Sequence, residues 1–277
     1  MRKFYFILSF IFIISCSNHL SFNEFYIKNS QNEPIYVKVD GLKNASYKKL
    51  AFIQHGLASN MDHQVIQTAK QAFLAHHYVV ITFDSRYSLG KSGNDVQKVL
   101  LSTFTEDLET VIDWAKKQPF YSEPFALSGH SLGGASVLQY SARHPEKVNI
   151  LVPIAPVISG DLWEKSCMKN LSEFCRLWKQ NGFYEYTDTK INKTAVIPYN
   201  VVTNSKSYNA YTLAPAITTK TLIIAGDKDI IIAADDVKNL VRIMPKASYM
   251  VVKNSEHNFE IQKNQEDLYK SIENFIK

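Results

Sequence analysis

Apolar runs of about six residues alternate along most of the chain with segments of helical periodicity. The unbroken run at residues 78–83 is rich in β-branched and aromatic side chains, which predicts a strand buried on both faces of a sheet. Residues 103–117 instead predict an amphipathic helix, because one stripe carries Leu108, Val111, Ile112 and Trp114. The same criteria predict a strand pair within residues 25–39, strands at 50–54, 124–127, 148–154, 221–225 and 249–252, and helices at 63–76, 135–144, 234–243 and 265–275.

This alternation predicts an α/β fold with a mostly parallel central sheet and helices on both faces. The alternation of predicted strands and helices is interrupted in residues 157–219, which are rich in Lys, Asn and aromatic side chains. We interpret this segment as a small, partly helical lid inserted into the domain. Its aromatic residues could line a pocket for an acyl or aryl group, although packing of the lid onto the sheet is the commoner role for any single one: Trp163, Phe174, Trp178, Phe183, Tyr184 and Tyr186.

Residues 1–15 have the pattern of a secretion signal, in which Arg2 and Lys3 precede an apolar stretch. This stretch is shorter than the about 20 residues that a transmembrane helix needs. It ends in Ile-Ile-Ser-Cys16, which resembles a bacterial lipobox, where the cysteine is lipidated and becomes the first residue. The alternative is ordinary cleavage near this point, with Cys16 incidental. We therefore expect a signal peptide at 1–15, a tether at 16–24 and one α/β domain at 25–277.

The signal predicts a cell-envelope location. With a lipid anchor on Cys16 the protein would attach to a membrane, and Ser17 favours the outer membrane in a Gram-negative host because an aspartate there often signals inner-membrane retention. Without lipidation the protein would be secreted or periplasmic. A compartment of this kind also allows Cys167 and Cys175 to form a disulfide.

The spacing of these two cysteines limits how they can pair. Eight residues along one straight helix would separate Cys167 from Cys175 by about 12 Å, which is too far for a disulfide. Pairing therefore requires a break in the helix, such as one near Asn170. Two free, half-buried thiols are the alternative.

Composition and charge exclude several classes of partner. The formal net charge of +5 falls to +3 (5 − 2) once Arg2 and Lys3 are removed, which is too small to indicate nucleic-acid binding. The 262 residues that follow the signal (277 − 15) fit one α/β domain with an insertion. We expect neither a metal nor another cofactor, because no His, Asp and Glu cluster has a convincing ligand spacing.

The chemistry is concentrated in Gly129-His130-Ser131-Leu132-Gly133, between a predicted strand and a predicted helix. A Gly-x-Ser-x-Gly in that context predicts a nucleophile elbow, a sharp turn that holds the serine in a strained backbone conformation. Side chains at Gly129 and Gly133 would collide where strand and helix nearly touch. We expect His130 to point away from the hydroxyl and to pack or shape the pocket.

The partners of Ser131 are expected later in the chain, in the order acid and then histidine. Asp227 and Asp229 follow one predicted strand, and His257 follows the next. All of them lie just past strand ends, where open α/β sheets have their active sites. His257 is the predicted base, and either aspartate could orient it.

These motifs resemble those of the α/β-hydrolase superfamily, in particular its small capped branch of esterases, acyl hydrolases and serine aminopeptidases. The resemblance runs from about residue 25 to residue 276 and includes His55-Gly56, the elbow, the Gly-x-x-Asp that ends at Asp229, and His257. It implies that Asp229, and not Asp227, is the triad acid. The loop at residues 84–92 departs from the family pattern, with Tyr87 where a glycine is common and one additional residue, so its shape stays open.

The resemblance implies a serine hydrolase that cleaves carboxylic esters through an acyl-enzyme. The backbone N–H groups of Leu57 and Leu132 would form the oxyanion hole, and His55 would shape the loop rather than act as a second base. The substrate would be a small-molecule ester or, in a peptidase or amidase with the same triad, a short peptide. A non-catalytic envelope binding protein is a further alternative. The remaining histidines fall on predicted exposed helices or linkers without a partner pattern: His19, His63, His76, His77 and His144.

Overall fold

The computed structural model describes residues 23–42, 49–93 and 95–277. Cys16, His19 and the predicted signal peptide lie outside these residues. The described elements are, in chain order, β1 (Glu24–Lys28), β2 (Pro34–Asp40), β3 (Leu50–Gln54), α1 (Gln64–Ala75), β4 (Val79–Asp84), η1 (Val96–Lys98), α2 (Leu101–Ala115), β5 (Phe125–His130), α3 (Leu132–Arg143), β6 (Val148–Ile154), α4 (Gly160–Asn170), α5 (Ser172–Asn181), β7 (Phe183–Asp188), β8 (Lys193–Pro198), α6 (Asn200–Ser205), α7 (Ala210–Leu213), η2 (Ala214–Ala216), β9 (Lys220–Gly226), α8 (Ala234–Ile243), β10 (Ala247–Val252) and α9 (Gln262–Ile276).

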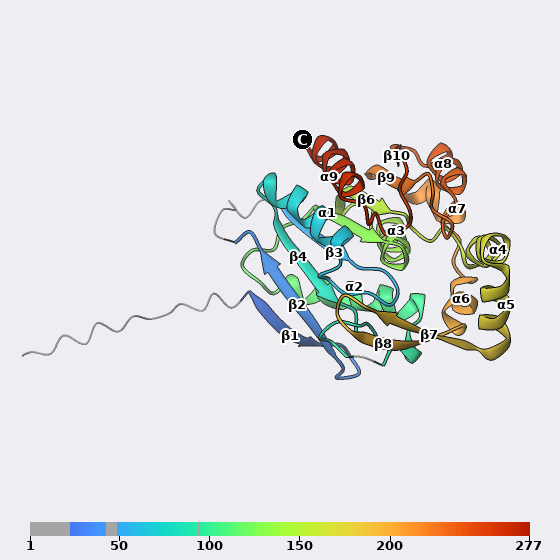
Figure 1. Cartoon of the computed structure of the whole chain (residues 1–277). Coiled ribbons are helices and arrows are strands. Elements are labelled where there is room, and N and C mark those ends of the chain that lie inside the picture. Colours follow the sequence, from blue (N-terminus) through green and yellow to red (C-terminus); the bar gives the residue numbers. More distant parts are fainter. Residues whose placement is uncertain (1–22, 43–48, 94) are drawn as a thin grey trace, which may run out of the picture.

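The main sheet has the strand order β1-β2-β4-β3-β5-β6-β9-β10 (Figure 1). Pairing is parallel from β4 through β3, β5, β6 and β9 to β10, and the strands β1 and β2 join one edge in antiparallel orientation. The predicted mostly parallel sheet is therefore confirmed. From β3 the chain goes outward to β4 and then returns past β3 to β5. A reversal of this kind leaves a crevice at the carboxyl ends of the neighbouring strands.

Alternating residues of each strand feed two separate apolar cores, because successive side chains point to opposite faces of a sheet. In β3, Leu50 and Phe52 belong to one core, and Ala51 and Ile53 belong to the other. Helices α2 and α3 cover the first face, and α1 and α9, which contact each other, cover the second. The helices on both faces match the prediction.

Two sequence-based details are wrong. The elbow helix α3 begins at Leu132, directly after the serine, and not at residue 135. The prediction began too late because Gly133 and Gly134 have no side chains that could show the apolar stripe. Trp114 is half-buried rather than part of the core stripe of α2. Its ring lies 5.1 Å from the ring of Phe25, which belongs to the edge strand β1.

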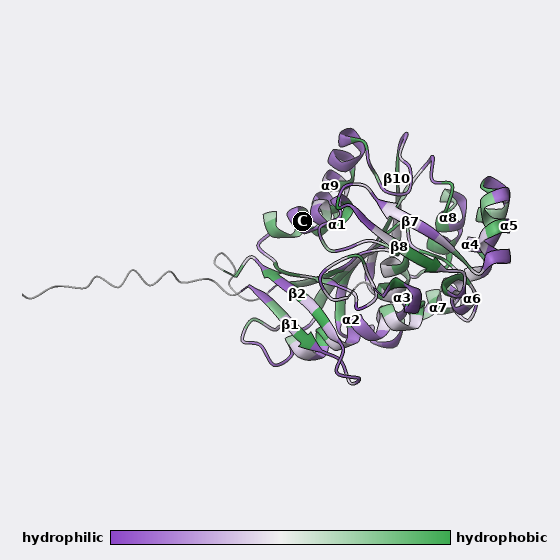
Figure 2. Cartoon of the chain, turned by 60° about the horizontal axis from the view of Figure 1, so that its bottom comes forward, coloured by the Kyte–Doolittle hydropathy of each residue, from purple (hydrophilic) through white to green (hydrophobic). Residues whose placement is uncertain are grey.

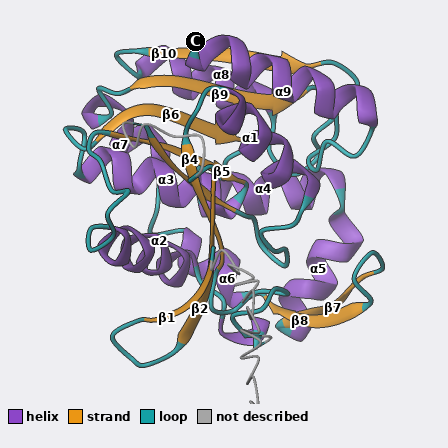
Figure 3. Cartoon of the chain, turned by 90° about the vertical axis from the view of Figure 1, so that its left-hand side faces the viewer, coloured by secondary structure: helices purple, strands orange, loops and turns teal. Residues whose placement is uncertain are grey.

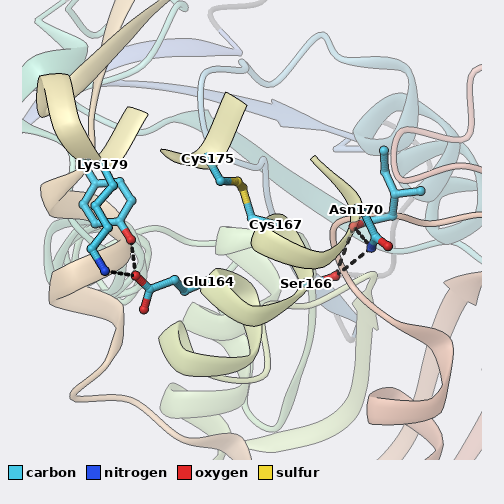
Figure 4. The surroundings of a disulfide bond; sticks show 8 residues. Glu164, Ser166, Cys167, Asn170, Cys175 and Lys179 are labelled. Atoms are coloured by element: carbon cyan, nitrogen blue, oxygen red, sulfur yellow. Dashed lines mark hydrogen bonds and ion pairs between the residues drawn. A yellow bond between two sulfur atoms is a disulfide. The ribbon is translucent and has the colours of Figure 1, made fainter. Parts of the chain in front are cut away.

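The insertion between β6 and β9 is the lid, and it combines helices with the hairpin β7–β8. The hairpin and α5 lie at the opposite end of the molecule from α9 (Figure 3). A disulfide joins Cys167 of α4 to Cys175 of α5, with the two Cα atoms 5.9 Å apart (Figure 4). The chain turns between the two helices at Leu171, which supplies the break that such a pairing requires.

Surface ion pairs and buried apolar contacts hold the elements of the lid together. Lys179 of α5 donates to Glu164 of α4 at 2.7 Å, and Lys206 donates to the same carboxylate (Figure 4 shows the first pair). In β8, which is coloured as hydrophobic in Figure 2, Ala195 and Ile197 are buried. The indole of Trp178 donates to the carbonyl of Ile197 at 3.0 Å, so α5 and the hairpin form one unit.

Helix α9 is mostly hydrophilic on its outer side (Figure 2). Among the helices of the described ranges, none is both long and apolar enough to cross a membrane.

Candidate active site

The turn between β5 and α3 holds Ser131 in a strained backbone conformation, with φ 55° and ψ −114°. The N–H of Ser131 donates to the carbonyl of Ile154 at 2.9 Å, and the carbonyl of Ser131 accepts from Ala135 and Val157 at 3.1 Å each. A Cβ atom on Gly129 would lie 2.3 Å from the carbonyl oxygen of Gly133. The close approach of strand and helix therefore excludes a side chain there.

Ser131, His257 and Asp229 form a continuous line of hydrogen bonds. The Nε2 atom of His257 lies 2.9 Å from the Oγ atom of Ser131, and its Nδ1 atom lies 2.7 Å from the Oδ2 atom of Asp229. The three residues come from the carboxyl ends of β5, β9 and β10, which are separated along the sheet by β6 alone. The sheet therefore brings together residues about 100 positions apart in the sequence.

The structure distinguishes the two aspartates. The side chain of Asp229 is fully buried, and its Oδ1 atom accepts from the N–H groups of Ile231 and Ile232 at 2.8 and 2.9 Å. Asp227 is 26% exposed and lies 3.7 Å from the ammonium group of Lys253. Asp229 thus meets the histidine, and Asp227 is a half-exposed loop residue.

His55 orients the peptide that precedes Leu57. The Nε2 atom of His55 accepts from the N–H of Ser85 at 2.9 Å, so Nδ1 carries the proton and donates to the carbonyl of Gly56 at 2.7 Å. In a planar trans peptide the C=O and the following N–H point in opposite directions. The N–H of Leu57 is therefore directed away from His55, whereas Leu132 supplies one of the first N–H groups of α3, which lack partners within the helix.

The unusual loop after β4 is tied to this region through Asp84. Its carboxylate accepts from the N–H groups of Met61 and Lys91, at 2.7 Å each. A Cβ atom on Gly90 would lie 2.0 Å from the Cγ atom of Asp84, so the loop needs a glycine at this position. Tyr87, the residue that departs from the expected loop pattern, donates to Glu33 at 2.6 Å.

A cavity of about 280 Å³ opens onto Ser131 between the sheet and the lid. Lid side chains supply an apolar and aromatic wall, and polar side chains from the hairpin tip and the loops beside it complete the lining. Phe183, one of the aromatic residues singled out in the sequence, is 48% exposed and does not line the cavity. The wall includes Trp163, Leu171, Phe174, Trp178, Tyr184, Tyr186, Ile230 and Ile231, and the polar lining includes His63, His130, Asp188, Lys190, His257, Asn258 and Glu260.

His63 is a pocket residue that the sequence reading missed. It is the N-cap of α1, where its Nδ1 atom accepts from the N–H of Val65 at 3.4 Å, and its ring stacks on that of His130 at 5.8 Å. Burial, aided by the charge of Lys190, lowers the pKa of His63 to about 4. The expectation of an exposed histidine without a partner is therefore wrong. Its position at the start of the predicted helix was the available signal.

An elbow serine, a histidine and a buried carboxylate at the carboxyl ends of parallel strands, under an inserted lid, are the arrangement of an α/β-hydrolase, and the chain is an enzyme of that class. Residues 45–207 match the family described as serine aminopeptidase, S33. Because this match covers more than half of the chain, the protein belongs to that family.

Other comparisons agree at the level of the fold. Over 145 residues the chain is 25% identical to the uncharacterized hydrolase YraK of Bacillus subtilis (strain 168), and this match spans 50% of the chain and 51% of the relative. The structure of Est1E from Butyrivibrio proteoclasticus with ferulic acid bound superposes with a TM-score of 0.74 at 19% identity, covering 91% of this chain and 97% of that one. Mouse alpha/beta hydrolase domain-containing protein 10 gives 0.69 at 20% identity, with 91% and 98% covered.

Acidification should destabilise the wild-type protein more than a His63→Asn variant. In the unfolded chain His63 binds a proton near pH 6.5, whereas in the fold it does so near pH 4. Its contribution to stability is therefore complete above pH 6.5 and is lost as the pH falls from 6.5 to 4. Asparagine keeps the N-cap acceptor and does not titrate. Urea unfolding at pH 7 and pH 5 should show an excess loss of about 2 kcal/mol in the wild type, and equal losses would contradict a neutral, buried His63.

Proposed function

We propose that this protein is a serine hydrolase that cleaves carboxylic esters with Ser131, His257 and Asp229. The observation that carries the proposal is the unbroken line from the Asp229 carboxylate through His257 to the Ser131 hydroxyl. A serine hydroxyl becomes a useful nucleophile only when a base within hydrogen-bonding distance removes its proton during attack. The side of this line that faces the cavity is open to a substrate.

The protons can be followed from the geometry. Asp229 accepts at Nδ1 of His257, so the neutral ring presents a bare Nε2 atom to the Ser131 hydroxyl. As Ser131 Oγ bonds to the ester carbon, its proton moves to Nε2 and the carbonyl oxygen becomes an oxyanion. Collapse of this intermediate breaks the bond to the alcohol, which takes the proton from His257. Water then attacks the acyl-serine by the same route and releases the acid.

The oxyanion is assigned to the backbone N–H groups of Leu57 and Leu132. Both residues are next to groups that touch the cavity, Gly56 and Ser131. Two N–H groups aimed at the developing charge stabilise the tetrahedral intermediate more than the planar ester. The bond from His55 to the Gly56 carbonyl supports this role, because it fixes the peptide that carries the Leu57 N–H.

The lining of the cavity favours an ester with an apolar acyl group. Pockets bind ligands mainly through apolar contact area, with a few polar groups for orientation. The aromatic wall from α4, α5 and β7, including Trp163 and Trp178, provides such area. A peptidase that recognises a free amino group is the second candidate, because Asp188 and Glu260 also line the cavity and could pair with an ammonium group.

Labelling and matched aspartate variants test the triad. A fluorophosphonate should modify Ser131 at neutral pH, and Ser131→Ala should abolish labelling. Asp229→Asn should lower kcat by roughly 10³- to 10⁴-fold, because His257 loses the partner that fixes its tautomer. Asp227→Asn is the control and should stay within about twofold of the wild type. Absence of labelling would instead support a non-catalytic binding protein.

Chromogenic substrates separate the two kinds of hydrolysis. We expect p-nitrophenyl acyl esters to be cleaved with a kcat/KM at least about 10² times that of aminoacyl p-nitroanilides, because the wall of the cavity is apolar. Steady-state kinetics on both series at pH 7.5 gives the ratio. A preference for the anilides that is lost in Asp188→Asn or Glu260→Gln would establish the peptidase instead.

We also propose that the enzyme works in the cell envelope, tethered through a lipid on Cys16, which lies outside the described residues. Support comes from the sequence, where Cys16 directly follows a short apolar stretch after Arg2 and Lys3. Cys16→Ser should move the expressed protein from the membrane fraction to the soluble fraction of a bacterial host, with Cys167→Ser as the control that stays bound. Unchanged fractionation of Cys16→Ser would remove the anchor.

A further inference from the structure

His130, directly before the nucleophile, bonds to the backbone of the catalytic base. Its Nε2 atom lies 3.0 Å from the carbonyl oxygen of His257. Its ring packs 4.9 Å from the ring of His257 and 5.8 Å from that of His63, to which it is nearly parallel. On its other side, a Cβ atom on Gly56 would be 3.1 Å from Nδ1 of His130. The imidazole is thus enclosed between the elbow, the oxyanion loop and the loop that carries the base.

The partner of Nε2 decides the tautomer of His130. A carbonyl oxygen only accepts, so Nε2 carries the proton and donates, and Nδ1 of the neutral ring is bare. Burial lowers the pKa of His130 well below its usual range, and the neighbouring imidazoles of His257, His63 and His55 act in the same direction. The ring therefore stays neutral beside His257, which becomes charged during each catalytic step.

The loop after β10 needs such an attachment. It carries Asn254 and Phe259 with positive φ angles of 54° and 51°, so strained backbone flanks His257 on both sides. Side-chain donors hold two consecutive carbonyls of this loop: His130 holds that of His257, and Gln64 holds that of Asn258 at 3.0 Å. The bond from His130 joins the backbone of this loop to the elbow, beside the side-chain bond between His257 and Ser131.

We propose that His130 is a positioning residue, which holds the His257 backbone so that the imidazole Nε2 stays within reach of the Ser131 hydroxyl. This inference rests on the proposed triad. The bond links the residue adjacent to the nucleophile with the residue that supplies the base, so it sets their separation directly. A displacement of about 1 Å between reacting groups can cost about 10²-fold in rate.

Two variants of similar length test the hydrogen bond. His130→Gln keeps an N–H donor at the ε position, and His130→Met replaces it with an apolar group. We expect Met to lower kcat about 10- to 100-fold for a p-nitrophenyl ester, with KM within about twofold of the wild type, and Gln to recover kcat to within about fivefold. Rates are expressed per active site, counted by fluorophosphonate titration, so that misfolded molecules do not enter the comparison.

The outcomes are distinct. Equal kcat for Met and wild type, or equal losses for Met and Gln, would overturn the positioning role. If the wild type neither hydrolyses esters nor reacts with the fluorophosphonate, the proposed function fails instead.

A measurement on the unmodified protein covers the case in which both variants fail to fold. Nitrogen NMR of the wild type with ¹⁵N-labelled histidine should show His130 protonated at Nε2 and bare at Nδ1 from pH 5 to pH 8. The opposite tautomer, or titration within that range, would refute the inference.

Discussion

The close contact between β5 and α3 around Ser131 is the constraint on which the rest of the site depends. A Cβ on Gly129 of the strand would lie 2.3 Å from the carbonyl oxygen of Gly133 in the helix, and a Cβ on Gly133 would lie 2.4 Å from the carbonyl oxygen of His55, which follows β3. The strained serine backbone persists because its N–H and C=O bond to neighbouring backbone groups at about 3 Å. In this conformation Ser131 lines the cavity.

The parallel sheet converts that local turn into a three-residue site. Parallel strands end on the same side, so residues that follow β5, β9 and β10 meet although they are remote in sequence. The same geometry brings the oxyanion loop after β3 beside the elbow, since β3 pairs with β5. Gly133 packs against the carbonyl of His55, so the elbow and the oxyanion loop fix each other.

Periodicity and spacing were sufficient to predict the parallel sheet, the helices on both faces and the lid insertion. They indicated that Ser131 and His257 lie close together, as the structure has them, because both follow the ends of parallel strands. They could not rank Asp229 against Asp227 without the family pattern, since both follow the same strand and burial alone separates them. The hairpin β7–β8 escaped prediction because β7 has no buried position and β8 buries only Ala195 and Ile197, which leaves a weak strand pattern. His63 escaped because its role comes from packing between remote elements, and the sequence indicated that His130 packs at the pocket but not that it bonds to the carbonyl of His257.

The environment of His257 explains why a buried carboxylate is needed. The rings nearest to it, His130 and, beyond it, His63, are kept neutral by burial, and the lid adds aromatic surface. A charge that develops on His257 in such surroundings loses much of its hydration. Asp229, which has two backbone N–H groups on one oxygen and the histidine on the other, offsets that loss without moving. In the proposed mechanism the lid therefore both shapes the cavity and makes His257 depend more on Asp229, because excluding water strengthens the attraction between the two.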